Sequence, residues 1–243
     1  MVYERLSLCL LFAFGAPACR TPAALDPMAS LAEECAHVLH RVRGWPVLVE
    51  EAWALSEPAL AEDVLVHLDV QLYQVERAVS GGQLDSLREV PIWIEPTDPE
   101  ELLGGMCYHP DADWLEEHGY DPRRALGVEI SDPGAFLTVT RTQPWVVMHE
   151  LAHAYHHRVL GFDEPRIREA YKEAVERGNY EETFRLHGRP DRHYALTNHK
   201  EYFAEGTEAY FYHNDFYPFV RAELKQHDPT LHDALEKIWG PVR

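Results

Sequence analysis

Residues 144–161 read PWVVMHELAHAYHHRVLG and are the most informative stretch of the chain. A proline suits the first position of a helix, apolar side chains follow it, and the closing glycine provides a stop, so the stretch predicts an α-helix. His149 and His153 are four residues apart, so both imidazoles lie on one face of that helix and can reach one cation. Glu150 lies about a quarter turn aside, where it can touch a water on the cation without binding the cation itself.

A second stretch, residues 194–211, reads YALTNHKEYFAEGTEAYF and contains another predicted helix. Glu201, Glu205 and Glu208 fall at i, i+4 and i+7, on one face of it and among apolar and aromatic side chains. Carboxylates in such surroundings are costly unless a cation or hydrogen bonds compensate them. A metal ion held by the two histidines would do so. The alternative is that the histidines are satisfied core residues and the glutamates form the solvated face of an amphipathic helix.

The composition is that of an ordinary globular protein, with 243 residues, 46% hydrophobic and 26% charged. This length suits one sizeable domain, or one domain with two lobes around a cleft. The formal charge of −19 argues against nucleic acid as a partner, because the phosphate backbone would repel it. An acidic surface favours a basic peptide substrate, or it only keeps the protein in solution.

The N-terminus resembles a sorting segment. Residues 6–14 form an apolar run that is too short to span a bilayer, and Ala-Pro-Ala at 16–18 resembles a cleavage site. We therefore expect a signal peptide over residues 1–18, no transmembrane span, and a protein that is secreted or held in the cell envelope. Cys19 directly after it is a possible lipid anchor, which would make the protein a lipoprotein. The Pro- and Ala-rich residues 19–28 predict a linker.

The chain has four cysteines. Cys9 would leave with the signal peptide, and if Cys19 carries a lipid, Cys35 and Cys107 remain as a pair. In an oxidising compartment that pair could form a disulfide. Two buried free thiols are the equal alternative.

Apolar periodicity and turn signals predict an α+β fold with a small mixed sheet lobe, the helix of the first stretch, and a mainly helical C-terminal lobe. No internal repeat is visible, so residues 29–243 are expected to form a single domain. The predicted strands are 45–50, 90–95 and 127–131. The predicted helices are 29–43, 60–79, 145–160, 164–177, 199–213, 216–227 and 229–239.

Together the two stretches resemble the gluzincin metallopeptidases, in which an HExxH helix is followed by a helix that carries a glutamate ligand. More narrowly, Tyr194 lies seven residues before Glu201, where the run E-Y-F-A-E begins, and this resembles the catalytic domain of the anthrax toxin lethal factor family. The resemblance covers roughly residues 143–211, and the chain lacks the length for the toxin's receptor-binding and substrate-docking domains. The metzincin pattern is broken, because His156 and Val159 stand where it has glycine and a third histidine.

This resemblance implies a zincin-like metallopeptidase domain and one bound zinc ion. Carried over residue by residue, the zinc ligands are His149, His153 and Glu201. Glu150 would be the general base, and Tyr194 would stabilise the oxyanion. Glu205, one turn after Glu201, matches a second-shell carboxylate that orients a ligating histidine.

The implied function is a zinc-dependent endopeptidase that hydrolyses peptide bonds of a peptide or protein substrate, through a metal-activated water and a glutamate general base. The alternative is a non-catalytic, zinc-stabilised peptide-binding or cell-surface protein. The sequence names neither the substrate nor the oligomeric state.

Several neighbours of these motifs have more than one reading. His156 is expected to support the metal ligands or to be exposed, and His193 and His199 are reserve ligands. The strand at 128–130 is a candidate sheet edge for pairing with an extended peptide. Two further residues either line the cleft or pack in the core: Tyr108 and His109.

Overall fold

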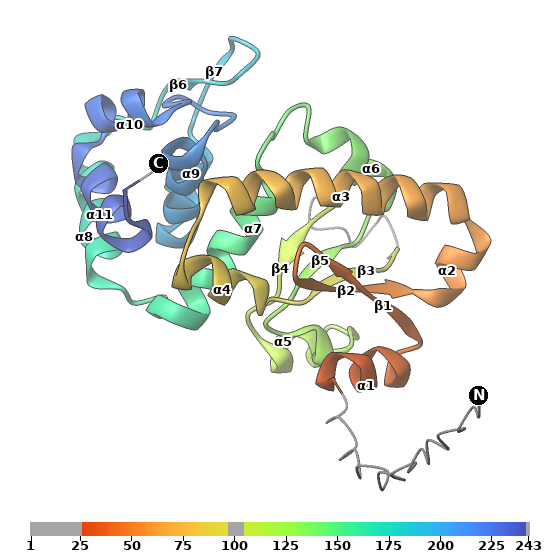
Figure 1. Cartoon of the computed structure of the whole chain (residues 1–243). Helices are drawn as coiled ribbons and strands as arrows, with labels where there is room; N and C mark the ends of the chain where they lie inside the picture. The colour runs from red at the N-terminus through yellow and green to blue at the C-terminus, as the bar shows by residue number, and fades with distance from the viewer. Residues whose placement is uncertain (1–25, 97–104, 242–243) are drawn as a thin grey trace, which may run out of the picture.

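A five-stranded mixed sheet organises the first half of the protein in this computed structural model, which describes residues 26–96 and 105–241 (Figure 1). The strand order is β1-β2-β3-β5-β4. The central strands β2, β3 and β5 run parallel, whereas β1 and β4 pair antiparallel at the two edges. The strands are β1 His37–Val42, β2 Trp45–Glu50, β3 Ile92–Ile94, β4 Cys107–Tyr108 and β5 Val128–Ile130.

Helices cover both faces of this sheet, as Figure 1 shows, because β2 and β3 at its centre are apolar on both sides. Val47 and Val49 of β2 point into the main core, whereas Leu48 between them packs with Trp93 and Ala32 on the opposite face. The long α3 lies along the first face, and α1 and α5 lie beyond the second. The helices of this half are α1 Pro27–Glu34, α2 Glu51–Ser56, α3 Pro58–Ala78, α4 Gly82–Arg88, α5 Ala112–Glu117 and α6 Pro133–Val139, with a 3-10 turn, η2, at Pro122–Arg124.

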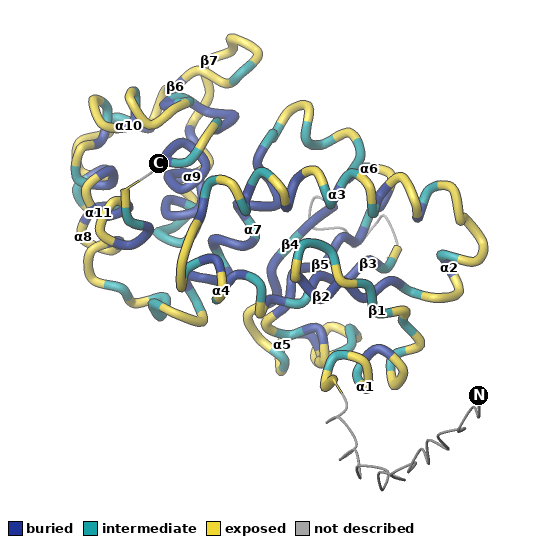
Figure 2. The backbone as a smooth tube through the Cα atoms, in the orientation of Figure 1, coloured by how far each residue is buried: buried dark blue, intermediate teal, exposed yellow. Residues whose placement is uncertain are grey.

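The second half is mainly helical, and a small hairpin projects from it (Figure 1). Helix α9 packs against α7, and Figure 2 shows α9 among the most buried segments of this half. Gly206 permits close packing of α9 against α11, because a Cβ there would lie 2.6 Å from Leu231 Cδ2. The elements are α7 Val146–Tyr155, the π-helical η3 His156–Leu160, α8 Pro165–Arg177, β6 Thr183–Phe184, β7 Pro190–Asp191, the 3-10 turn η4 Tyr194–Thr197, α9 His199–Phe211, α10 Arg221–His227 and α11 Pro229–Trp239.

One continuous hydrophobic core joins the two halves. It runs from Trp45 of β2 to Trp239 of α11 and includes apolar residues of α3, α7 and α9. Helix α7 contributes Val146, Val147 and Leu151 to this core, so it is buried against the sheet side and the helical side together. The α+β class with a small mixed sheet is therefore confirmed, and α7 lies where the two halves meet.

The predicted helix over residues 29–43 is wrong beyond Glu34. The chain turns at Ala36, which has a positive φ of 57°, and then forms strand β1. Arg43 and Gly44, both at positive φ, make the tight turn that returns the chain into β2. Pairing of this segment with the buried strand β2 outweighs its weak helical periodicity.

The predicted helix over 216–227 is also too long, because α10 begins only at Arg221. Pro218 has no N–H to donate and disfavours helical geometry in the residue before it. The hairpin of β6 and β7 was not predicted. Its short strands pair at Thr183–Asp191 and Phe184–Pro190, and an isolated bridge joins Arg185 to Phe216.

The linker predicted over residues 19–28 is wrong at its C-terminal end, where helix α1 begins. Pro27 and Met28 form the first turn of α1, and the Asp26 side chain accepts a hydrogen bond of 3.0 Å from the Met28 N–H. The predicted signal peptide over 1–18 and the lipid site at Cys19 lie outside the described residues. Among the helices of residues 26–96 and 105–241, none is long and apolar enough to cross a membrane.

The disulfide between Cys35 and Cys107 does not form. Both thiols are free in the structure, as the alternative expected, but each is only partly buried. Cys35 packs beside the small core cluster of Ala32, Leu48 and Trp93, whereas Cys107 lies on β4 at the other edge of the sheet.

Candidate metal centre

The structure brings His149, His153 and Glu201 together. The Nε2 atom of His149 lies 3.1 Å from Glu201 Oε2, and the Nε2 atom of His153 lies 3.2 Å from the same oxygen. All three ligand atoms lie within 4.8 Å of one another. The two histidines come from α7 and the glutamate from α9, so the contact between these helices assembles the group.

Local structure places each of these side chains. On α7 the four-residue spacing points both imidazoles to the same side of the helix. On α9 the Asn198 side chain caps the first turn, accepting hydrogen bonds from the N–H groups of Lys200 at 2.8 Å and Glu201 at 3.0 Å. The cap fixes where α9 begins and therefore where the Glu201 carboxylate projects.

This donor set fits a zinc ion. Two imidazoles and one carboxylate are a usual catalytic zinc set, and ligand distances near 2.05 Å in a tetrahedron imply ligand-to-ligand separations of about 3.3 Å. The observed separations of 3.1 and 3.2 Å are close to that value. The residues present can hold a zinc ion with little rearrangement.

The electrostatics of the group also call for a positive charge. Burial alone would raise the pKa of Glu201, but hydrogen bonds from His149 and His153 outweigh it and hold that pKa below its usual range. Burial alone would lower the pKa of His149, but Glu201 and Glu208 outweigh it and hold that pKa well above its ordinary value. A positive charge is therefore stabilised between these side chains, and a divalent cation can provide it.

Glu208, and not Glu205, forms the direct hydrogen bond with His149. The Nδ1–H of His149 donates to Glu208 Oε1 at 2.7 Å, whereas Glu205 Oε1 is 3.8 Å from the same nitrogen. The sequence-based prediction assigned this role to Glu205, but Glu208 lies closer to His149 on the same face of α9. Burial raises the pKa of Glu208 to about 7, and burial together with the Glu208 charge raises the pKa of Glu205 well above its usual range.

Glu150 lies beside the group and is held by the edge strand. The backbone N–H of Tyr108, in β4, donates to Glu150 Oε2 at 2.8 Å. Burial raises the pKa of Glu150, although the positive charges of His149 and His153 act in the opposite direction. A carboxylate with a raised pKa is a better proton acceptor than an ordinary one.

A cavity of about 570 Å³ opens in front of the group. Tyr194, in η4, lines it with 48% of its surface exposed, and its ring centroid lies 6.4 Å from that of His149. The cavity lining therefore includes the six residues assigned from the two sequence motifs: His149, Glu150, His153, Tyr194, Glu201 and Glu205. The lining residues include Met106, Cys107, Tyr108, Gln143, Val146, His149, Glu150, His153, Arg185, Asp191, Arg192, Tyr194, Glu201, Glu205, Asp215 and Phe216.

Sequence reasoning missed the part of the lining that comes from the β6–β7 hairpin and the segment after α9. Arg185 contacts Asp215 at 3.3 Å and stacks over Phe216 at 4.6 Å, and Arg192 lies 3.2 Å from Glu181. No motif marks these residues, and only the fold brings them to the cavity.

The three other histidines considered near the site do not join the ligand group. His156 is fully buried, and neither of its ring nitrogens has a hydrogen-bond partner in the part of the chain that the structure describes. His193 is buried and accepts from the Ala195 N–H at 3.1 Å. His199 Nε2 lies 2.8 Å from the carbonyl oxygen of Phe162.

The structure answers two questions that the sequence left open, about Tyr108 and about the strand at 128–130. Tyr108 both lines the cavity and packs, because its ring lies in the main core and its hydroxyl is 3.0 Å from His157 Nδ1. The strand at 128–130, which is β5, is not an edge, because β3 and β4 flank it. The edge beside the cavity is β4.

Comparisons with protein-family models, with curated proteins and with solved structures found no match for this chain.

Proposed function

We propose that this protein is a zinc-dependent endopeptidase with a zincin-like fold, related to the gluzincins and, more narrowly, to the catalytic domain of the lethal factor family. The observation that carries the proposal is the meeting of His149, His153 and Glu201 in one cavity, with Glu150 beside them. Three protein ligands leave a fourth position open, which is typical of a catalytic zinc site.

When bound there, zinc would lower the pKa of a water molecule toward neutrality and polarise the scissile carbonyl. Glu150 takes a proton from the attacking water and later delivers it to the leaving amine. The N–H of Tyr108 holds one Glu150 oxygen at 2.8 Å, which leaves the other oxygen for the water. The raised pKa of Glu150 favours the uptake of the proton.

Tyr194 donates its hydroxyl proton in a hydrogen bond to the oxyanion that develops during attack. Its exposure to the cavity allows this contact with a bound substrate. Burial and the charge of Glu201 raise the pKa of Tyr194, so its hydroxyl keeps its proton at neutral pH.

The edge strand β4 offers a place for the substrate backbone. In the described part of the chain it pairs with β5 alone, and its residues line the cavity. An extended peptide can add to such an edge through backbone hydrogen bonds. The cavity lining holds five carboxylates against two guanidinium groups, so basic peptides are the expected substrates: Glu150, Asp191, Glu201, Glu205 and Asp215 against Arg185 and Arg192.

The test is digestion of a proteome-derived peptide library by the purified zinc-loaded protein. We expect cleavage that stops with a chelator, returns with zinc, and is absent in Glu150→Gln. A zinc-loaded protein that cleaves no peptide would favour the alternative, a non-catalytic protein stabilised by its metal. The open cavity and the placement of Glu150 favour catalysis, because structural zinc sites are normally closed by a fourth protein ligand.

A further inference from the structure

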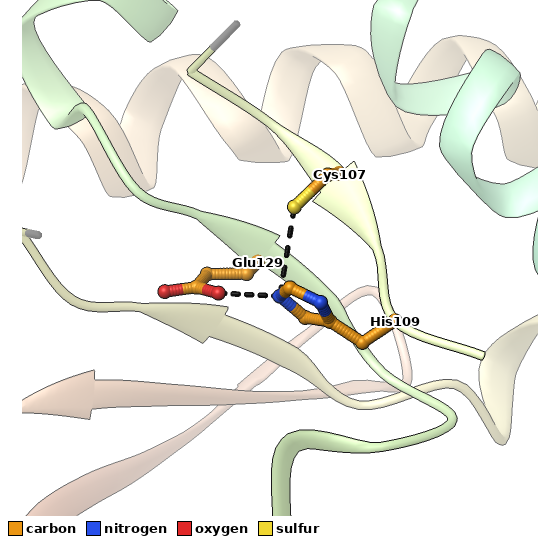
Figure 3. Close-up of side chains that lie close together, drawn as sticks. All are labelled: Cys107, His109 and Glu129. Carbon is orange, nitrogen blue, oxygen red and sulfur yellow. Dashed lines mark hydrogen bonds and ion pairs between the residues drawn. The ribbon is translucent and has the colours of Figure 1, made fainter. Parts of the chain in front are cut away.

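A second group of metal-ligand side chains lies on the sheet, outside the ligand set described above. Cys107 belongs to β4, His109 follows that strand directly, and Glu129 belongs to β5. Figure 3 shows the three side chains pointing toward one another from these segments. Their ligand atoms all lie within 4.8 Å of one another.

The strand register explains why they meet. Cys107 is paired with Glu129 across the antiparallel ladder of β4 and β5, so both side chains leave the sheet on the same face. His109 is two residues after Cys107, and the strand periodicity returns it to that face. The N–H of His109 donates to the Gly127 carbonyl at 3.0 Å, which holds the chain in position beyond the end of β4.

One ring nitrogen carries both contacts of the group. His109 Nε2 lies 3.5 Å from Cys107 Sγ and 2.5 Å from Glu129 Oε2. A single proton on that nitrogen can serve only one of these two neighbours well. A cation between the three atoms would be shared by all of them.

The distances suit a small soft cation. A tetrahedral zinc ion with one nitrogen and one sulfur ligand separates the two by about 3.6 Å, close to the observed 3.5 Å. The carboxylate oxygen would have to move back by roughly 0.8 Å to reach a ligand-to-ligand separation of about 3.3 Å. The other oxygen of Glu129 accepts a hydrogen bond from Arg124 Nη1 at 2.7 Å, so the carboxylate would rotate about this contact.

The surroundings support a charged ligand set. Glu129 and His109 are buried, whereas Cys107 is partly exposed and lines the 570 Å³ cavity, which gives an ion a path inward. Arg124 is itself buried and also contacts Glu95 at 2.6 Å. Because Arg124 contacts Oε1 of Glu129, Oε2 remains on the side of His109. A buried carboxylate that keeps one oxygen for a ligand is a usual arrangement around a metal.

We propose that Cys107, His109 and Glu129 bind a second divalent ion of the zinc type, distinct from the ion of the His149, His153 and Glu201 group. A thiolate, an imidazole and a carboxylate together favour zinc over magnesium or calcium, which prefer oxygen ligands alone. The inference concerns binding and does not depend on peptidase activity.

Binding changes the protonation of the thiol. A cysteine thiol with an ordinary pKa is mostly protonated at neutral pH. On binding, the divalent ion replaces that proton at sulfur, one proton leaves to solvent, and nothing is oxidised or reduced.

The second ion would act on the neighbouring site through the backbone. Tyr108 lies between two of the ligands, and its N–H is the one that holds Glu150. An ion that fixes Cys107 and His109 would fix this N–H as well.

Cobalt provides a test that separates the two sites, because only a cysteine ligand produces a thiolate-to-cobalt charge-transfer band in the near ultraviolet. The full chain is prepared with Cys9, Cys19 and Cys35 changed to Ser, which leaves Cys107 as its one cysteine. We expect this protein to show the band on cobalt titration and to hold two zinc ions per chain. Adding His149→Ala should remove one ion and leave the band, whereas adding His109→Ala should remove the band.

The matched control retains Cys35 in place of Cys107, with the other three cysteines changed to Ser, and is expected to show no band. No band in the Cys107 chain at saturating cobalt would overturn the proposal, whatever the peptide digestion shows. A band of equal strength in the Cys35 control would overturn it too, because the sulfur ligand would then not be specific to Cys107. Neither result depends on peptide cleavage. The second metal site can therefore be disproved while the endopeptidase proposal stands, and the endopeptidase proposal can be disproved while the second metal site stands.

Discussion

The Nδ1 atom of His149 lies 2.7 Å from Oε1 of Glu208, and this contact joins α7, which carries His149 and His153, to α9, which carries Glu201. Both residues are fully or almost fully buried. The contact fixes the tautomer of His149, since a proton on Nδ1 leaves Nε2 free for a metal.

We expect Glu208→Gln to weaken zinc binding at this site by about 10- to 100-fold, because a charged partner that orients the ligand and raises its basicity is lost. Glu205→Gln, with the same change of charge one turn earlier, should weaken binding much less. Zinc affinity measured against a competing chelator, in a Cys107→Ser background, gives the comparison. A larger loss in Glu205→Gln than in Glu208→Gln would restore the sequence-based assignment of Glu205.

His153→Ala, in the same Cys107→Ser background, should be purified without zinc at moderate chelator strength, because two protein ligands hold the ion poorly. Elemental analysis of the dialysed protein measures this. The exposed His187 provides a control, and His187→Ala should keep its zinc. Stoichiometric zinc in His153→Ala would show that the ligand assignment is wrong.

Glu150→Gln keeps the shape of the side chain and an oxygen that can accept from the Tyr108 N–H. Zinc should therefore stay, while peptide hydrolysis falls by about 10²–10⁴-fold through the lost general base. The kcat for a cleaved library peptide and the zinc content are measured on the same sample. If Glu150→Gln keeps both its turnover and its zinc, another group accepts the proton.

Tyr194→Phe should keep zinc and substrate affinity but lose roughly 10²–10³-fold in kcat, because the oxyanion loses a hydrogen-bond donor. Tyr212→Phe is the control, since Tyr212 is also exposed but does not line the cavity. Steady-state kinetics on one peptide separate kcat from KM. If Tyr194→Phe cleaves at the wild-type rate, the oxyanion contact comes from elsewhere.

Two buried histidines predict that the metal-free protein loses stability in mild acid. Burial lowers the pKa of His156 and of His193 to about 3, from an ordinary value near 6.5. Between these two pH values the unfolded chain binds more protons than the folded one. The contribution of these histidines to the free energy of unfolding is therefore complete above about pH 6.5 and decreases as the pH drops toward 3. Thermal unfolding in the presence of chelator at several pH values measures this dependence.

The contribution of His156 can be isolated with His156→Leu. Both ring nitrogens lack a partner in the described part of the chain, so an apolar side chain of similar size should stabilise the protein by about 1 kcal/mol. For a chain of this length that corresponds to a rise in Tm of about 2–4 °C. The acid dependence should become flatter as well. A lower Tm, or an unchanged acid dependence, would contradict this reading of His156, and the exposed His187→Leu should change neither.

The elements that sequence patterns predicted well are the long amphipathic ones. The predicted helix 60–79 corresponds to α3 at Pro58–Ala78, and the predicted strand 45–50 to β2. Their periodicity is long enough to determine which face is buried. The segment 29–43 was misassigned because its few apolar residues fit both a helix and a strand, and only pairing with β2 favours the strand.

The sequence was sufficient to predict the part of the candidate site that depends on local geometry. A spacing of four residues on a helix places His149 and His153 on one face whatever surrounds them, and the same periodicity aligned the glutamates of α9. Tertiary structure alone decided the choice of Glu208 over Glu205, the position of β4 as the edge beside the cavity, and the meeting of Cys107 with Glu129. These features depend on how separate elements pack and on strand register, which arise from contacts between residues far apart in the chain and leave no periodic trace in it.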